Sequence, residues 1–224
     1  MRQYFIYKDL FIESDVQLCL DLFDKNINDF DFVSTMFKLA EKYNLHGNLF
    51  QSLLTYLLAN HENIFSLSLE RRKNIDENLK RVVIDDLNDI YYLFHYDFNC
   101  LDDLYRQLFM DFKQSKPIIN QEIYDVLYDL QINLSKTKTV EEFYNILNNH
   151  YSRFGVGMYG LNKAFRYSEG KIIPIDHIGN ESFNDLIGYE NQKNLLKENT
   201  EIFLKGNKAN NVLLYGDSGT GKSS

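Results

Sequence analysis

The chain has 224 residues, a formal net charge of −8, and 16 Tyr and 17 Phe but no Trp. This composition excludes a disordered chain, collagen and a disulfide scaffold, and 44% hydrophobic residues can fill a sizeable core without a metal or covalent staple. The acidic balance disfavours nucleic acid and anionic lipid as partners.

The two cysteines and the N-terminal segment indicate a compartment. Cys19 and Cys100 are far apart and form no CxxC pair, so we expect reduced thiols in a reducing environment, both buried as apolar fillers. Charged residues interrupt the first fifteen positions, and no later stretch approaches the roughly 18 uninterrupted apolar residues of a membrane span. We therefore expect a cytoplasmic protein with no membrane partner.

Glycine divides the chain. Of its 11 glycines only Gly47 precedes residue 155, so a long stretch with few helix breakers should be mostly continuous helix. Apolar residues recur there at helical spacing. They predict seven amphipathic helices through Val16–Phe23, Phe32–Tyr43, Leu49–Leu57, Val83–Phe94, Leu101–Phe112 (with Leu104 and Leu108 on the apolar stripe), Ile123–Leu134 and Val140–Tyr151.

Two helix starts carry a capping-box pattern, Ser14 with Gln17 and Thr139 with Glu142. No fixed repeat period is visible, so a recognised helical solenoid is not supported. We predict a mainly α protein: an irregular helical N-terminal domain at 1–154, a connector at 155–180, and at 181–224 the truncated start of an α/β P-loop nucleotide-binding domain. In the connector, Ser168, Glu169 and Gly170 could turn a β-hairpin.

The last thirteen residues, VLLYGDSGTGKSS, match the phosphate-binding pattern GxxxxGK[ST] at every fixed position. Val212–Tyr215 would be the preceding strand. Backbone amides of the glycine-rich turn would converge on the phosphates, Lys222 would reach the β- and γ-phosphates, and the Ser223 hydroxyl would ligate Mg²⁺. The alternative is a glycine-rich turn that binds nothing.

Residues 181–224 resemble the AAA+ ATPases, most closely an uncharacterised bacterial AAA+ family. From Phe183 on, this segment reads FNDLIGYENQKNLLKENTEIFLKGNKANNVLLYGDSGTGKSS. An LIGYE turn, an amphipathic helix and a short loop before the P-loop strand follow the AAA+ order, whereas most P-loop kinases and GTPases start almost directly at the strand. A P-loop kinase is therefore a minor third option. Many AAA+ proteins have two prolines where this chain has Asp217 and Ser218.

The resemblance implies ATP and Mg²⁺ as cofactors. Ile187 and Gly188 would border the adenine, and Ser223 would hold the metal. The residues that would wrap the phosphates are Gly216, Asp217, Ser218, Gly219, Thr220, Gly221, Lys222, Ser223 and Ser224. No catalytic residue is assigned, because the acidic pair, the sensor and the arginine of such enzymes follow later in the chain.

The sequence ends one residue after Ser223. We expect it to be the N-terminal part of a longer ATPase, inactive by itself and binding ATP weakly or not at all. The complete protein would hydrolyse ATP to remodel or load a partner recognised by the helical domain, and it could form a homo-oligomer, as a ring or partial ring. The alternative is a helical protein-interaction module with a vestigial, non-catalytic P-loop.

Other clusters have simpler interpretations. The five histidines show no metal-ligand spacing, and the pairs Asp85–Asp86, Asp102–Asp103 and Glu141–Glu142 suit helix starts or polar faces better than a catalytic carboxylate pair. The basic cluster Arg71–Lys73, with Lys80 and Arg81, is interleaved with acids and favours a solvated face over a nucleic-acid site.

Overall fold

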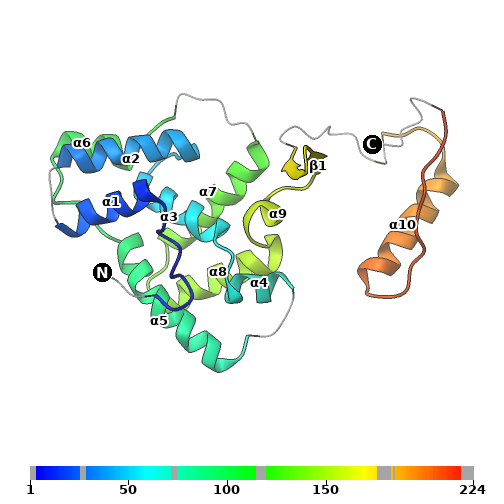
Figure 1. Ribbon diagram of the computed structural model, residues 1–224, viewed down its shortest axis with the longest axis horizontal. Helices are drawn as coiled ribbons and strands as arrows, with labels where there is room; N and C mark the ends of the chain where they lie inside the picture. The colour runs from blue at the N-terminus through cyan, green and yellow to red at the C-terminus, as the bar shows by residue number, and fades with distance from the viewer. Residues whose placement is uncertain are drawn as a thin grey trace. The chain divides into compact units, whose positions relative to one another are not determined.

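The computed structural model describes residues 4–25, 29–71, 75–114, 120–175, 183 and 185–217 (Figure 1). Helix accounts for 62% of these residues, which confirms the mainly α fold. The chain divides into two compact units, Met1–Asp176 and His177–Ser224. The domain boundaries expected at 154 and 180 stay predictions.

The elements follow one another with short connections. Their order is α1 (Ser14–Lys25), α2 (Asp29–Tyr43), α3 (Leu49–Asn60), α4 (Ile64–Glu70), α5 (Glu77–Phe94), α6 (Asp103–Met110), α7 (Gln121–Ser135), α8 (Val140–Phe154), α9 (Gly157–Leu161), β1 (Phe165–Ser168), β2 (Lys171–Pro174) and α10 (Glu190–Leu204). All seven helices predicted from periodicity are confirmed, as α1, α2, α3, α5, α6, α7 and α8. Helices α4 and α9 were not predicted.

Side-chain caps explain several of the helix starts. The Thr139 hydroxyl accepts from the backbone N–H of Glu142 at 3.2 Å, and the Glu142 carboxylate accepts from the backbone N–H of Lys138 at 2.7 Å, one residue earlier than a standard capping box. Asn63 caps α4 in a full capping box with Ser66. The spacing of Asn63 and Ser66 is a sequence signal from which α4 could have been predicted.

Helix α1 begins one residue earlier than the predicted box at Ser14 and Gln17 implies. Helix α1 already includes Ser14, and the backbone N–H of Gln17 donates to the carbonyl of Glu13, so Glu13 takes the capping position. The Gln17 side-chain amide donates to the Asp21 carboxylate at 3.0 Å, one turn further along the helix.

The core of Met1–Asp176 is aromatic. Helix α2 packs on α1, α3 and α6, helix α3 packs on α7, and α8 packs on α4 and α5 (Figure 1). The rings that meet where α1, α2, α3 and α6 converge belong to Phe23, Phe32, Phe50, Phe98 and Phe109. These contacts join residues up to 77 positions apart, from Phe32 to Phe109, and they belong to one cluster of buried residues in this unit.

A buried carboxylate ties the N-terminal segment to the core. Asp86, 3% exposed on α5, accepts hydrogen bonds from the backbone N–H groups of Phe5, Ile6 and Tyr7 at 2.9, 2.6 and 2.9 Å. Three consecutive amides around one carboxylate compensate for its burial. Asp86 therefore has a structural role, which corrects the expectation that it lies at a helix start or on a polar face.

Helix α6 is rotated relative to the predicted stripe. Leu104 and Leu108 were placed on the apolar face, but they are 62% and 47% exposed, while Phe109 is fully buried. The backbone groups of Gly47 and Phe112 exchange two hydrogen bonds, 2.8 and 3.0 Å long, and this bridge anchors the chain just after α6. Cys100 is likewise exposed rather than buried, whereas Cys19 is buried, and both are free.

A β-hairpin with a two-residue turn follows α9. Strands β1 and β2 pair antiparallel, with Tyr167 opposite Ile172. Glu169 and Gly170 connect them with φ of +50° and +80°, the pair of positive values that a type I′ turn requires and that glycine adopts at little cost.

The unit His177–Ser224 contains α10 and the segments on either side of it. Among the described residues, only Lys193 of α10 is buried, while Leu195, Phe203 and Leu204 are 68%, 70% and 71% exposed. None of the described helices combines the length and apolar character needed to cross a membrane.

Candidate functional site: the segment leading to the phosphate-binding pattern

The turn before α10 has a left-handed backbone. Gly188 has a φ of +85°, and Tyr189, at the N-cap of α10, has φ +59° and ψ +30°. A left-handed residue other than glycine costs about 1–2 kcal/mol, so other contacts must stabilise the turn. The first of these is the helical bond from the backbone N–H of Lys193 to the carbonyl of Tyr189, at 2.9 Å.

The Lys193 side chain supplies the other contacts. Its ammonium donates to the carbonyl of Leu186 at 2.9 Å and to that of Phe183 at 3.3 Å, and it pairs with the Glu190 carboxylate at 2.6 Å. The residue is only 9% exposed. A buried ammonium needs such partners, so Lys193 fixes the turn against the first turn of α10.

The predicted adenine residues lie in this turn. The Ile187 side chain is 96% exposed, and a Cβ added at Gly188 would meet no atom within 4 Å. Within the described part of the chain, therefore, the turn has a defined backbone but no wall against which a base would pack.

A second anchor holds the chain after α10. The Asn199 carboxamide accepts from the backbone N–H of Asn210 and donates to the carbonyl of the same residue, both at 2.9 Å. One side chain thus makes the two hydrogen bonds that a neighbouring strand would make. This pairing ties the segment after the helix back to α10, two positions before Val212.

The strand expected at Val212–Tyr215 is absent, and this corrects the prediction. Residues 208–216 have no regular secondary structure, and the four apolar side chains are 50%, 82%, 50% and 89% exposed. The physical reason is that a strand exists only through hydrogen bonds to a neighbour. In the part of the chain that the structure describes, the only strands are β1 and β2, and they pair with each other.

Only the first two residues of the phosphate-binding pattern, Gly216 and Asp217, are described. The seven that follow, Ser218–Ser224, lie outside the described residues, among them Lys222 and Ser223. An amine and a hydroxyl at these two positions suit a magnesium–triphosphate chemically. The described residues, however, form no cradle for such a group, so the assignment rests on the sequence pattern.

The sequence does not predict the two residues that anchor this unit, Lys193 and Asn199. Lysine and asparagine are common on exposed helix faces, and nothing in their spacing distinguishes these two. Only the tertiary contacts reveal them.

The remaining sequence candidates take structural roles. Lys80 pairs with Glu141 at 2.6 Å and Arg71 is exposed at the end of α4, whereas Arg72 and Lys73 lie outside the described residues. Asp102 caps α6. Among the described residues, no three His, Cys, Asp or Glu side chains gather as a metal site would require.

One family model matches the chain, over residues 161–224 and so over less than a third of its length. It is described as "Protein of unknown function (DUF815)". The matched region begins just before the hairpin and includes α10 and the phosphate-binding pattern. No curated protein and no solved structure matches significantly.

Proposed function

We propose that the chain carries the opening of an ATP-binding domain of the AAA+ type, joined to a helical domain that binds a protein partner. The observation that carries this proposal is the pattern from Gly216 to Ser223, which matches a P-loop at every fixed position. In the complete protein, ATP hydrolysis would remodel or load the partner. A homo-oligomeric ring and a cytoplasmic location, the latter from two unpaired cysteines, belong to the same proposal.

The local structure supports the proposal in one respect. A P-loop domain needs a buried central strand before the loop, and Val212–Tyr215 is an apolar segment left exposed and unpaired. Further strands from a P-loop sheet would cover such a segment. Bound ATP would supply the hydrolysable phosphoanhydride, and Lys222 and Ser223 would hold its phosphates and Mg²⁺.

The test is Mg-ATP binding by isothermal titration calorimetry to the protein as its own cells produce it. Lys222→Ala should abolish binding, because it removes the ammonium that meets the β- and γ-phosphates. Lys208→Ala, at an exposed lysine outside the pattern, is the matched control and should bind as the unaltered protein does. If affinity survives Lys222→Ala, the loop assignment is wrong.

The alternative function is that of a helical interaction module with a vestigial P-loop. It is favoured by Leu104 and Leu108, which lie one turn apart on α6 and are 62% and 47% exposed, because exposed apolar side chains at this spacing suit a protein contact. The same titration separates the two functions. If the native protein shows no Mg-ATP binding, the interaction module is the better account.

A further inference from the structure

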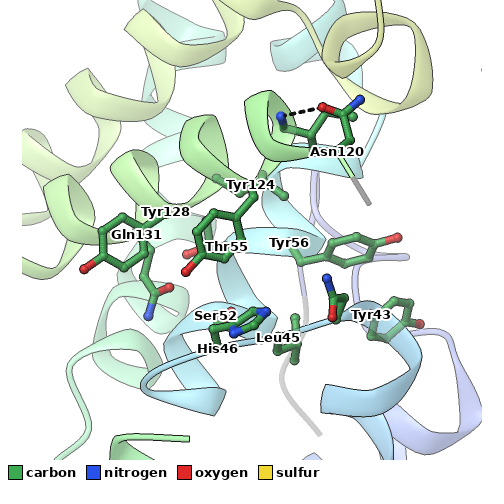
Figure 2. A pocket seen from close by; sticks show the side chains of 13 residues that line it. Tyr43, Leu45, His46, Ser52, Thr55, Tyr56, Asn120, Tyr124, Tyr128 and Gln131 are labelled. Atoms are coloured by element: carbon green, nitrogen blue, oxygen red, sulfur yellow. Dashed lines mark hydrogen bonds between the residues drawn. The ribbon is translucent and has the colours of Figure 1, made fainter. Parts of the chain in front are cut away.

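A cavity of about 410 Å³ lies within Met1–Asp176, between the end of α2, helix α3 and helix α7 (Figure 2). Its volume is in the range of small-molecule sites. The residues that line it are Tyr43, Asn44, Leu45, His46, Ser52, Thr55, Tyr56, Asn120, Ile123, Tyr124, Leu127, Tyr128 and Gln131. None belongs to the phosphate-binding pattern, so this cavity is a candidate site separate from the one proposed above.

Four of the lining residues are tyrosines, arranged as two pairs. The rings of Tyr43 and Tyr56 are 4.5 Å apart, and those of Tyr124 and Tyr128 are 5.9 Å apart and stacked. Figure 2 shows the first pair toward one end of the cavity and the second toward the other. Aromatic walls of this kind favour the faces and edges of another planar ring.

The described residues of the lining carry no acidic or basic side chain: there is no Asp, Glu, Lys or Arg among them. Burial lowers the pKa of His46, the one histidine among these residues, which favours the neutral imidazole. The His46 ring also packs edge-on against Tyr124, with centroids 5.1 Å apart. An ion entering the cavity would lose its hydration without an opposite charge on the described lining residues themselves, and this desolvation is costly.

Two polar atoms of lining residues lack a partner. Asn44 Oδ1 and His46 Nε2 are buried and make no hydrogen bond within the described chain. An unsatisfied buried polar atom is destabilising. The amide oxygen can only accept, so N–H groups on a bound molecule would relieve this cost.

We propose that this cavity binds a small, uncharged, planar ring compound that carries N–H groups. The ring lies against the tyrosines, and the N–H groups pair with the Asn44 carboxamide and the His46 imidazole. The size, the aromatic walls, the lack of charge on the described lining residues and the unpaired Asn44 oxygen each point to this class.

The test compares four probes. Benzamide is planar and neutral, benzoate is anionic and has no N–H group, benzamidine is cationic and keeps N–H groups, and cyclohexanecarboxamide keeps the amide without the planar ring. Each is titrated into the whole chain while the His46 and tyrosine ring signals are followed by NMR. We expect saturable shifts with benzamide and a Kd on the order of 1 mM, as befits so few atoms. The other three should bind at least about tenfold more weakly.

Variants tie the signal to the cavity. Tyr124→Leu removes a wall ring and should abolish saturable binding, whereas Tyr92→Leu, at a tyrosine 71% exposed on α5, should leave it unchanged. Should Tyr124→Leu fail to fold, Asn44→Gly provides a second test, because glycine tolerates the φ of +55° found there. It should weaken benzamide about threefold to tenfold through the lost acceptor.

Several outcomes overturn the proposal. These are shifts that do not saturate by about 10 mM benzamide, equal binding of the four probes, and benzamide binding that survives both Tyr124→Leu and Asn44→Gly. Tighter binding of benzamidine would overturn it in favour of an aromatic site for organic cations.

Discussion

Phe143 and Phe203 are both phenylalanines on amphipathic helices, but one is buried and the other is exposed. Phe143 on α8 is fully buried and has the rings of Tyr91, Phe94 and His95 around it. Phe203 on α10 is 70% exposed. The unit Met1–Asp176 buries its apolar stripes against one another, whereas the described part of His177–Ser224 leaves its own uncovered.

An apolar stripe therefore predicts a helix, but it does not predict that the side chains of the stripe are buried. Burial needs a second surface, and α8 finds one on α4 and α5. The order that exists around α10 comes from polar anchors instead, namely Lys193 on the preceding turn and Asn199 on the following segment. We therefore expect the stability of the described chain to reside in Met1–Asp176.

The largest effect should come from the matched pair of phenylalanines. Phe143→Ala should lower the free energy of unfolding by about 3–5 kcal/mol, through lost burial and the resulting cavity. Phe203→Ala should change it by less than about 0.5 kcal/mol, as for other exposed sites. Urea unfolding followed by circular dichroism measures both. A large loss at Phe203 would show that its face is covered in solution.

Acid should destabilise Met1–Asp176 through His150. Burial lowers the pKa of this imidazole from 6.5 to about 4, and its Nε2 has no partner among the described residues. Between these two pKa values the unfolded chain binds the proton and the folded chain does not. The free energy of unfolding should therefore fall as the pH drops from 6.5 toward 4, by about 3 kcal/mol in total, and this term should not vary above pH 6.5.

His150→Phe tests that assignment, because phenylalanine fills the site without titrating. Urea midpoints at pH 7 and near pH 5 should differ less in this variant than in the unaltered chain. His46 and His61, whose pKa values burial also lowers, add to the loss in the same direction. An unchanged pH dependence in His150→Phe would assign the acid sensitivity to other groups.

Asp86 should contribute a somewhat smaller amount. Asp86→Asn removes the charge that three backbone N–H groups share and turns an acceptor into a donor, so we expect a loss of about 2–3 kcal/mol. Asp85→Asn, at the exposed neighbour, should cost less than about 0.5 kcal/mol. Equal losses in urea unfolding would refute the role of Asp86 in anchoring residues 5–7.

The smallest effect should be confined to the second unit. Lys193→Met removes the ammonium that holds the carbonyls of Phe183 and Leu186, so the turn at 185–189 should open more readily, by about 1–2 kcal/mol or about 5- to 30-fold in amide exchange. Hydrogen–deuterium exchange read by mass spectrometry measures it. Lys205→Met, at a side chain 70% exposed, is the control. An equal increase in exchange elsewhere in the chain would contradict a local role.

The sequence determined those features that depend on neighbours a few residues away. Seven helices follow from apolar spacing, the Thr139 cap of α8 follows from its hydroxyl, and Glu169–Gly170 lie in a tight turn between two short strands. The phosphate-binding pattern was also visible from the sequence alone, because its residues are contiguous. Its local geometry beyond Asp217 remains a prediction.

Tertiary structure decided everything that required a distant partner. The exposed face of α6, the burial of Asp86 beneath residues 5–7 and the cavity between α2, α3 and α7 arise from contacts across tens of residues. Val212–Tyr215 also depends on a distant partner. The segment has the composition of a strand but forms none, because a strand forms only beside another one. Local chemistry thus determined the helices of this protein. Long-range contacts determined which helix faces are buried and which other segments form regular structure.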